Sequence, residues 1–402
     1  MKTVAVISEY NPFHLGHEYQ IKKIREEFGS DTRIIAIMSG NYTQRGDVAV
    51  MDKSMRAEMA VRCGVNLVLE LPFPFSISSA EIFAKSGVAI ADALGTIDYL
   101  SFGSESGDIK KLETIAEVFL SKEYNDELSA LISNEDNLGY PALCELAYKR
   151  VTNASISSSF FSPNNILAIE YIKALISSKS KILPHTIKRF GADYNSEKIT
   201  ENEFQSATAI RNILKTNIHS ALPYIPNNAH SLILSRHNQN LFPCDSERLA
   251  SAVISHFRLN LSEKIKIHDT SGGLYNRLRN ASFEADTIQK LIEIADTKKF
   301  TTARIRRAIW YSYFGVTSSK ILEKPRYTQV LAMDSVGKSI LKEIKKMAKI
   351  SVLTKPSAAS KLTETALEQK LFSDKADSVF HLAKPSFVSG NETLRTTPFI
   401  MK

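Results

Sequence analysis

Cysteine is scarce in this chain of 402 residues. Cys63, Cys144 and Cys244 are far apart and odd in number. They therefore provide neither a disulfide framework nor a cluster of metal ligands, and such usage is typical of a reducing compartment. On this basis we expect a cytoplasmic protein.

Long apolar runs and a secretory signal are also lacking. The apolar stretch over 66–71 is soon interrupted and is too short to span a bilayer. The N-terminus enters an apolar segment directly, without a basic region followed by a long apolar core. Hydrophobic residues make up 43% and charged residues 23% of the chain, as in soluble globular proteins. The length suits two or three domains.

Positive charge is distributed unevenly. The chain has a net charge of +8, and residues 301–350 alone contain 11 Lys and Arg against 3 Asp and Glu. The remainder is therefore neutral overall. This window predicts either a docking surface for a polyanion or a solvated helix face. Trp310, Tyr311, Tyr313 and Phe314 follow the arginines closely, which favours RNA as the polyanion.

The first half of the chain alternates between strand and helix patterns. Alternation with short connections predicts an α/β fold with a Rossmann-like parallel sheet covered on both faces. Residues 1–216 are the predicted catalytic domain, and residues 217–402, after a boundary marked by Pro223 and Pro226, are predicted to be mainly helical. The expected strands are 3–7, 33–38, 67–71, 99–102 and 182–187, with short strands at 351–354 and 378–382. The expected second-half helices are 229–237, 245–259, 284–296, 301–313 and 335–349.

The segment Tyr10-Asn-Pro-Phe-His-Leu-Gly-His17 carries the strongest chemical signal. It lies between an apolar strand and a helical stretch over 17–27, so the H-x-G-H motif lies at the sheet edge where α/β proteins bind ligands. A helix N-terminus offers unpaired N–H groups to phosphate, and two imidazoles add donors. Gly16 would let a nucleotide approach the backbone. The motif predicts attack on the α-phosphate of ATP, with His14 and His17 contacting the triphosphate.

Several other segments occur in a single order along the chain. They are Met38-Ser-Gly40, Gln44-Arg-Gly46, Glu70-Leu-Pro-Phe73, Phe102-Gly-Ser-Glu105, Ser162-Pro-Asn-Asn165 and Arg304-Ile-Arg-Arg307. Together with the H-x-G-H segment, they resemble the bacterial tRNA(Met) cytidine acetate ligases of the nucleotidylyltransferase-like superfamily. The resemblance covers both halves of the chain. It implies that acetate attacks ATP to give acetyl-adenylate and pyrophosphate, and that the acetyl group then passes to N4 of the wobble cytidine in elongator tRNA(Met).

The predicted ATP-binding residues come from several segments. Gly103 ends a strand at the same sheet edge, or is a plain turn glycine, and Asn11 is either a contact or a turn residue. One of Asn164 and Asn165 resembles the family's nucleotide-contacting asparagine, while the other caps a helix. Arg189 would bind phosphate or adenine, or form a surface ion pair. The full predicted set is Ile7, Ser8, Glu9, Tyr10, Asn11, Pro12, Phe13, His14, Leu15, Gly16, His17, Gly103, Asn164, Asn165, Arg189, Ser206 and Arg211, the last two resembling the superfamily's helix-start phosphate grip.

The second half supplies the predicted RNA contacts. Arg304 and Arg307 would share one face of a helix, with Arg306 offset by about 100°. The predicted tRNA-binding residues are Arg277, Arg279, Arg304, Arg306, Arg307, Lys324 and Arg326. No spacing of side chains predicts a metal site. Mg²⁺ is expected only as the companion of ATP, and no spacing singles out any of the loop acids Asp31, Asp47 and Asp52 as its ligand. No protein partner is evident.

Two other functions remain open at this point. A small-molecule adenylyltransferase could use the same H-x-G-H chemistry, but it would leave residues 217–402 unexplained. A non-catalytic RNA-binding protein with a nucleotide fold would leave the histidine pair without a role.

Overall fold

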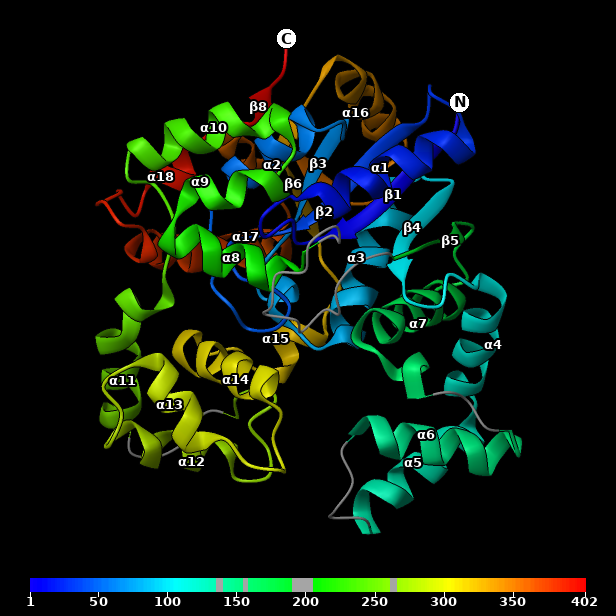
Figure 1. The fold of residues 1–402 in the computed structure, drawn as a ribbon, viewed down its shortest axis with the longest axis vertical. Coiled ribbons are helices and arrows are strands. Elements are labelled where there is room, and N and C mark those ends of the chain that lie inside the picture. Colours follow the sequence, from blue (N-terminus) through cyan, green and yellow to red (C-terminus); the bar gives the residue numbers. More distant parts are fainter. Residues whose placement is uncertain (135–139, 155–157, 190–204, 261–265) are drawn as a thin grey trace.

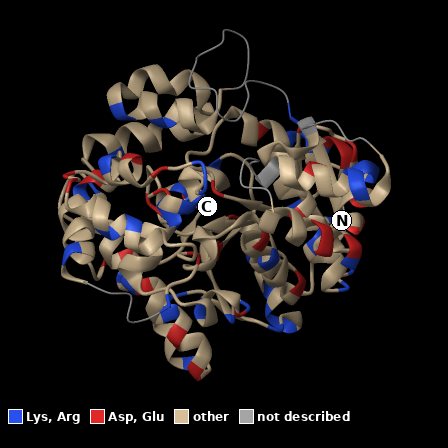
Figure 2. Cartoon of the chain, turned by 90° about the horizontal axis from the view of Figure 1, so that it is seen from below, with Lys and Arg blue, Asp and Glu red and all other residues tan. Residues whose placement is uncertain are grey.

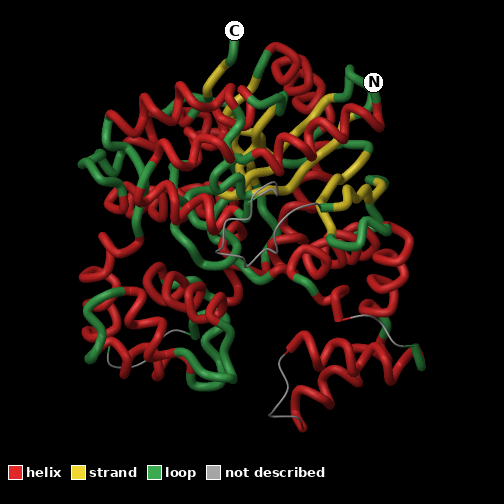
Figure 3. The backbone as a smooth tube through the Cα atoms, viewed as in Figure 1, coloured by secondary structure: helices red, strands yellow, loops and turns green. Residues whose placement is uncertain are grey.

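The computed structural model describes residues 1–134, 140–154, 158–189, 205–260 and 266–402. One sheet runs through the upper part of the molecule in Figure 3, and helices flank it. Its strand order is β5-β4-β1-β2-β3-β6-β7, with β8 beside β6. The first five strands are mutually parallel: β1 Thr3–Ser8, β2 Arg33–Ser39, β3 Leu67–Leu71, β4 Tyr99–Ser104 and β5 Leu183–Lys188. This arrangement confirms the predicted α/β class.

The central strands are buried on both faces, because alternating side chains enter different cores. Ala36 and Met38 pack with the helices α1 Leu15–Phe28 and α2 Lys53–Arg62 on one face. Ile37 packs on the opposite face with α3 Ala80–Leu94 and α7 Pro163–Ser177. The helix α16 Ser335–Met347 extends this second layer over Ile35. Continuous apolar strands are therefore explained by helices on both sides, as predicted.

Local capping fixes where several helices begin. Asp52 accepts a hydrogen bond from the backbone N–H of Met55 at the start of α2. Pro163 occupies the first turn of α7, where its missing N–H has no cost. Thr301 caps the helix α14 Thr302–Phe314 in the same way as Asp52 caps α2. Each of these termini depends on adjacent residues only.

Two strands of the second half, at 327–333 and 399–400, were not predicted from the sequence. β6 Tyr327–Met333 pairs antiparallel with β3, and all seven of its residues are buried. β7 Ser351–Leu353 and β8 Phe399–Ile400 both pair parallel with β6. The strand expected at 351–354 is thus confirmed, whereas the one expected at 378–382 is wrong because 378–380 end the helix α17 Glu364–Phe380. The sheet takes strands from both sides of residue 216, and the division into two domains stays a prediction.

The remaining helices form outlying groups. A helical unit of α11 Ala250–Leu259, α12 Leu274–Ser282, α13 Ile288–Ala295 and α14 lies below the sheet in Figure 1, and the pair α5 Lys122–Asn134 and α6 Tyr140–Thr152 lies on the other side. None of the helices in the described part of the chain combines the length and the apolar run that a membrane crossing needs. The other helices are α4 Ile109–Leu120, α8 Ala207–Thr216, α9 Ile218–Ala221, α10 Asn227–Asn238, α15 Ser318–Leu322 and α18 Glu392–Arg395.

Candidate functional site

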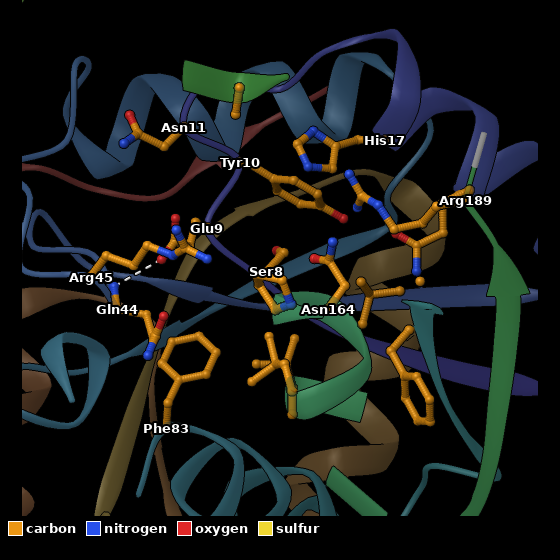
Figure 4. A pocket seen from close by; sticks show the side chains of 18 of the residues that line it. Ser8, Glu9, Tyr10, Asn11, His17, Gln44, Arg45, Phe83, Asn164 and Arg189 are labelled. Carbon is orange, nitrogen blue, oxygen red and sulfur yellow. Dashed lines mark hydrogen bonds between the residues drawn. The ribbon is translucent and has the colours of Figure 1, made fainter. Parts of the chain in front are cut away.

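A pocket of about 170 Å³ opens at the carboxyl ends of β1 and β4. Figure 4 shows Gln44, Arg45 and Glu9 on one side of it and His17, Arg189 and Asn164 on the other. This is the sheet edge that the sequence predicts for the site. The structure brings eleven of the predicted residues to its lining: Ile7, Ser8, Glu9, Tyr10, Asn11, His14, His17, Gly103, Asn164, Arg189 and Ser206.

The two histidines of the H-x-G-H motif form the N-terminal cap of α1. The Nδ1 atom of His14 accepts the backbone N–H of Gly16 at 3.0 Å, and Nδ1 of His17 accepts the backbone N–H of His14 at 3.2 Å. The two rings lie with their centroids 3.8 Å apart. Reciprocal capping of this kind satisfies helix-end donors and fixes both imidazoles on the rigid start of the helix.

Both imidazoles are uncharged in this environment. Burial, reinforced by the positive charges of Arg189 and Arg211, lowers the pKa of His14 to about 3. Burial and the neighbouring His14 lower the pKa of His17 well below its usual value. In a neutral ring whose Nδ1 accepts a hydrogen bond, the proton resides on Nε2. Each histidine therefore carries one Nε2–H donor, suited to oxygen atoms on which negative charge develops.

Gly16 does not line the pocket. A Cβ at this position would lie 2.9 Å from Cε1 of His14, so the glycine makes room for the folded-back histidine ring. Phe13 is fully buried and packs against the rings of Tyr10 and His17. Pro12 and Leu15 also lie outside the lining. These four residues therefore shape the motif without lining the pocket.

Arg211 reaches the motif from α8. Its Nη1 donates to the backbone carbonyl of Asn11 at 2.9 Å, while the Asn11 side chain accepts the N–H of Val50. The hydroxyl of Ser206 accepts the N–H of Ala209 and so caps α8, whose first residues face the pocket. Arg211 therefore holds the loop that carries His14, and it does not itself line the cavity.

The two adjacent asparagines have different environments. Asn164 lines the pocket and donates to Glu105 Oε1 at 2.6 Å. Asn165 is buried, and its Oδ1 accepts the backbone N–H groups of Glu105 and Ser106. Asn165 thus braces the loop after β4, and neither side chain makes the helix-capping bond that the sequence analysis assigned to one of them.

Arg189 follows β5 directly and its backbone N–H donates to the carbonyl of Ser104. It is exposed, and a Cβ on Gly103 would meet its Cγ at 3.0 Å. Gly103 therefore permits the arginine side chain to pass close beside β4. Arg189 lines the pocket on the same side as His17 and Asn164.

Sequence reasoning missed one side of the pocket. Gln44 and Arg45 belong to the loop after β2, and Tyr171 comes from α7. The N–H of Gln44 donates to Glu9 Oε1 at 2.8 Å, and burial raises the pKa of the Glu9 carboxyl. The segment Gln44-Arg-Gly46 was visible as part of the family pattern, but nothing local tied it to this pocket.

Four of the predicted RNA contacts pair with carboxylates or backbone carbonyls of the chain. Arg304 and Arg307 both pair with Asp269, at 2.9 and 3.3 Å. Arg306 pairs with Asp47 at 2.8 Å. Arg277 donates to the carbonyls of Ala295, Ile294 and Asp296 at the end of α13. These arginines support the helical unit and its attachment to the sheet.

The aromatic residues that favoured RNA do not form a stacking surface. Trp310, Tyr311 and Phe314 are buried in the core, so these three rings cannot stack on RNA bases. In Figure 2 Lys and Arg are interspersed with Asp and Glu over the ribbon. Arg279, half-buried on α12, donates to the side-chain oxygen of Asn280. Lys324 and Arg326 line a groove of about 690 Å³ of mixed charge, whose other charged residues are Lys85, Lys173, Lys349, Glu81, Asp92 and Glu170.

The described residues hold no group of three or more His, Cys, Asp or Glu side chains that could bind a metal ion. Asp47 pairs with Arg306, and Asp52 caps α2 and pairs with Lys384. Glu9 is the acidic residue of the pocket lining, and its carboxylate already accepts the Gln44 N–H.

Comparison with known proteins places the chain among relatives of full length. Residues 1–392 match the HIGH Nucleotidyl Transferase family. A tRNA(Met) cytidine acetate ligase of Acetivibrio thermocellus is 37% identical over 385 residues, covering 92% of both chains. One from Clostridium perfringens is 34% identical over 416 residues, covering 100% of both.

Solved structures are also similar to this chain over its full length. The apo crystal structure of Thermotoga maritima TmcAL is 31% identical, with a TM-score of 0.93 and full coverage of both chains. The structure of the same protein bound with alpha-thio ATP has a TM-score of 0.90 at 31% identity, covering 100% of this chain and 99% of that one.

Proposed function

Since the chain belongs to the HIGH Nucleotidyl Transferase family, and within it to the tRNA(Met) cytidine acetate ligases, we propose that it uses ATP and acetate to form N4-acetylcytidine at the wobble position of elongator tRNA(Met). The observation that carries this proposal is the pair of neutral histidines capping α1 at the pocket. A non-catalytic protein would have no use for this pair of oriented donors beside the pocket.

The first step is activation of acetate. A carboxylate oxygen of acetate attacks the α-phosphorus of ATP, the bond to the bridging oxygen breaks, and pyrophosphate leaves. Negative charge grows on the phosphoryl oxygens, so the Nε2–H groups of His14 and His17 act as electrostatic stabilisers already oriented by α1. The helix N-terminus adds its dipole. Arg189 supplies a full positive charge at the same pocket.

The second step transfers the acetyl group. The N4 amine of the cytidine attacks the acetyl carbon of acetyl-adenylate, loses a proton, and AMP leaves. This route needs no covalent enzyme intermediate. The buried cysteines at 63 and 244, whose pKa values burial raises to about 12, lie outside the pocket lining.

Mg²⁺ is expected to arrive with ATP. The protein side of the pocket fits a metal poorly, because burial favours the protonated form of Glu9 and its oxygen accepts Gln44 N–H. Mg²⁺ commonly keeps waters and takes its ligands from substrate phosphates. We therefore assign its coordination to the triphosphate rather than to side chains.

We propose tRNA contacts at the residues left available by the fold. Lys324 and Arg326, in the groove with Lys85 and Lys349, are the strongest of the seven predicted positions. Lys324→Ala with Arg326→Ala should weaken tRNA binding and flatten its salt dependence by roughly one unit per lost phosphate contact. Unchanged affinity and salt slope would remove this groove from the tRNA surface.

The test of function is ATP–pyrophosphate exchange with and without acetate, before any tRNA is added. We expect acetate-dependent exchange that His14→Ala or His17→Ala abolishes. Exchange that needs a phosphorylated small molecule instead of acetate would indicate an adenylyltransferase. No exchange, even with bulk tRNA, would leave only RNA binding. Addition of tRNA followed by nucleoside analysis would then identify the modified cytidine.

A further inference from the structure

The loop between β2 and α2 presents one wall of the pocket. Tyr42 and Val48 form an isolated antiparallel bridge, and the N–H of Thr43 donates to the carbonyl of Asp47 at 3.0 Å. This closed turn, residues 42–48, carries Gln44 and Arg45 at its tip. We call it the 42–48 turn. Its own hydrogen bonds define its shape but not its position relative to the sheet.

Gln44 is bonded to Glu9 and to the carbonyl of Ser78, and the base of the turn is held from a distant part of the sequence. Arg306 of α14 forms an ion pair with Asp47 at 2.8 Å, and Trp310 Nε1 donates to the carbonyl of Gly46 at 2.9 Å. Trp310 is buried and packs edge-on against Tyr42. The helix therefore contacts the turn at Tyr42, Gly46 and Asp47.

Gly46 shows how close this contact is. Its φ is +84°, and a Cβ there would lie 2.6 Å from both Cβ of Arg306 and the backbone N of Arg307. The backbone of the turn thus lies directly against the backbone of α14, where only glycine fits. Next to it, Tyr311 donates to the carbonyl of Ile77 at 2.6 Å, which anchors the helix to the segment before α3.

We propose that α14 is the positioning element of the nucleotide pocket: Arg306 and Trp310 hold the 42–48 turn so that Gln44 and Arg45 face the nucleotide. The inference rests on the proposed nucleotide site. It gives Arg306 a role different from the RNA contact that its basic sequence context predicts. Gln44 in turn holds Glu9, the residue that follows β1, because its backbone N–H donates to the Glu9 carboxyl.

The test measures ATP affinity by isothermal titration, because binding does not depend on the acetate reaction. Arg306→Ala and Asp47→Asn should each raise the dissociation constant for ATP about tenfold, since small displacements of positioned groups are costly. The double variant should be no weaker than either single variant, because both remove one interaction. Trp310→Phe should also weaken ATP binding while keeping an aromatic ring in the core.

Arg33→Ala is the matched control. Arg33 pairs with Glu343 at 2.6 Å and lies at the start of β2, at the opposite edge of the sheet from the pocket. This variant should lower the thermal unfolding midpoint at least as much as Arg306→Ala, yet leave the dissociation constant for ATP within twofold. In the exchange assay, Arg306→Ala should raise KM for ATP more than it lowers kcat.

Two results would overturn the inference. One is an unchanged ATP dissociation constant in Arg306→Ala, with tRNA affinity and its salt slope reduced, since that would make Arg306 a phosphate contact. The other is equal weakening of ATP binding in Arg306→Ala and Arg33→Ala, since that would reflect lost stability alone. Wild-type protein that binds ATP without exchange would refute the ligase proposal, while the ATP titrations would still judge the role of α14.

Discussion

Replacing Gly16 with alanine should separate activity from stability. The new Cβ would lie 2.9 Å from Cε1 and 3.0 Å from Nδ1 of His14. Real carbon–carbon contacts need about 3.5 Å or more, so the ring must move by about 0.5–1 Å. That movement breaks the hydrogen bond from the Gly16 N–H to Nδ1. It also shifts the Nε2–H donor that we assign to the phosphoryl oxygens.

The two effects on stability oppose each other. Losing a helix N-cap costs about 1 kcal/mol. Replacing glycine by alanine within a helix contributes about 0.8–1 kcal/mol of stability. The free energy of unfolding should therefore change by less than about 1 kcal/mol. Activity has no such compensation, and a misplacement of about 1 Å is expected to lower the rate about 10²-fold.

Urea unfolding and ATP–pyrophosphate exchange measure the two quantities on the same preparation. Gly273→Ala is the control, because Gly273 has φ +89° and no atom within 4 Å of an added Cβ. Alanine there should cost about 1–2 kcal/mol from backbone strain and leave exchange unaltered. Wild-type exchange in Gly16→Ala would refute the assignment of His14 to the reacting phosphate.

The remaining predictions concern buried charge. Arg56 is fully buried and donates to four backbone carbonyls at the ends of β1 and β2 and the start of α2. Arg56→Lys should therefore lower the free energy of unfolding, measured in urea, by about 2–4 kcal/mol. A smaller decrease would mean that water replaces the guanidinium. Lys53 lies between the carboxylates of Glu70 and Asp377. Lys53→Met should lower the free energy of unfolding by about 3–5 kcal/mol at neutral pH, and adding Asp377→Asn should restore part of that stability. If the double variant is no more stable than Lys53→Met, repulsion between the two carboxylates is not the cause. The pKa of His14 is about 3 in the folded protein and about 6.5 in the unfolded chain, so only the unfolded state takes up this proton as pH falls from about 6.5 toward 3. The stability of the fold should therefore fall over that window. It should fall less steeply in His14→Gln, as measured by unfolding midpoints at several pH values.

The parts of this protein that sequence could predict are those fixed by neighbouring residues. The strand, the H-x-G-H turn and the helix that begins at Leu15 follow from a local pattern, and Asp52 could be assigned as a cap for the same reason. The pocket's position at the sheet edge follows from this local order together with the general behaviour of parallel sheets.

The parts that sequence could not predict depend on distant contacts. β6 is a short buried run whose partner β3 is far away in the chain, so no alternation or turn signal marks it. The pairing of Arg306 with Asp47 joins segments that no local rule connects. Composition identified the arginines as basic but could not show that carboxylates elsewhere in the chain neutralise them.

The antiparallel pairing of β6 with β3 also constrains how the chain is made. Leu67 and Val68 emerge from the ribosome long before their partners Met333 and Ala332. Because synthesis adds about 5–20 residues per second, one edge of β3 has no partner strand for tens of seconds. Such an edge is a template for aggregation. A fragment ending at residue 216 would lack β6 and would carry that unpaired edge permanently.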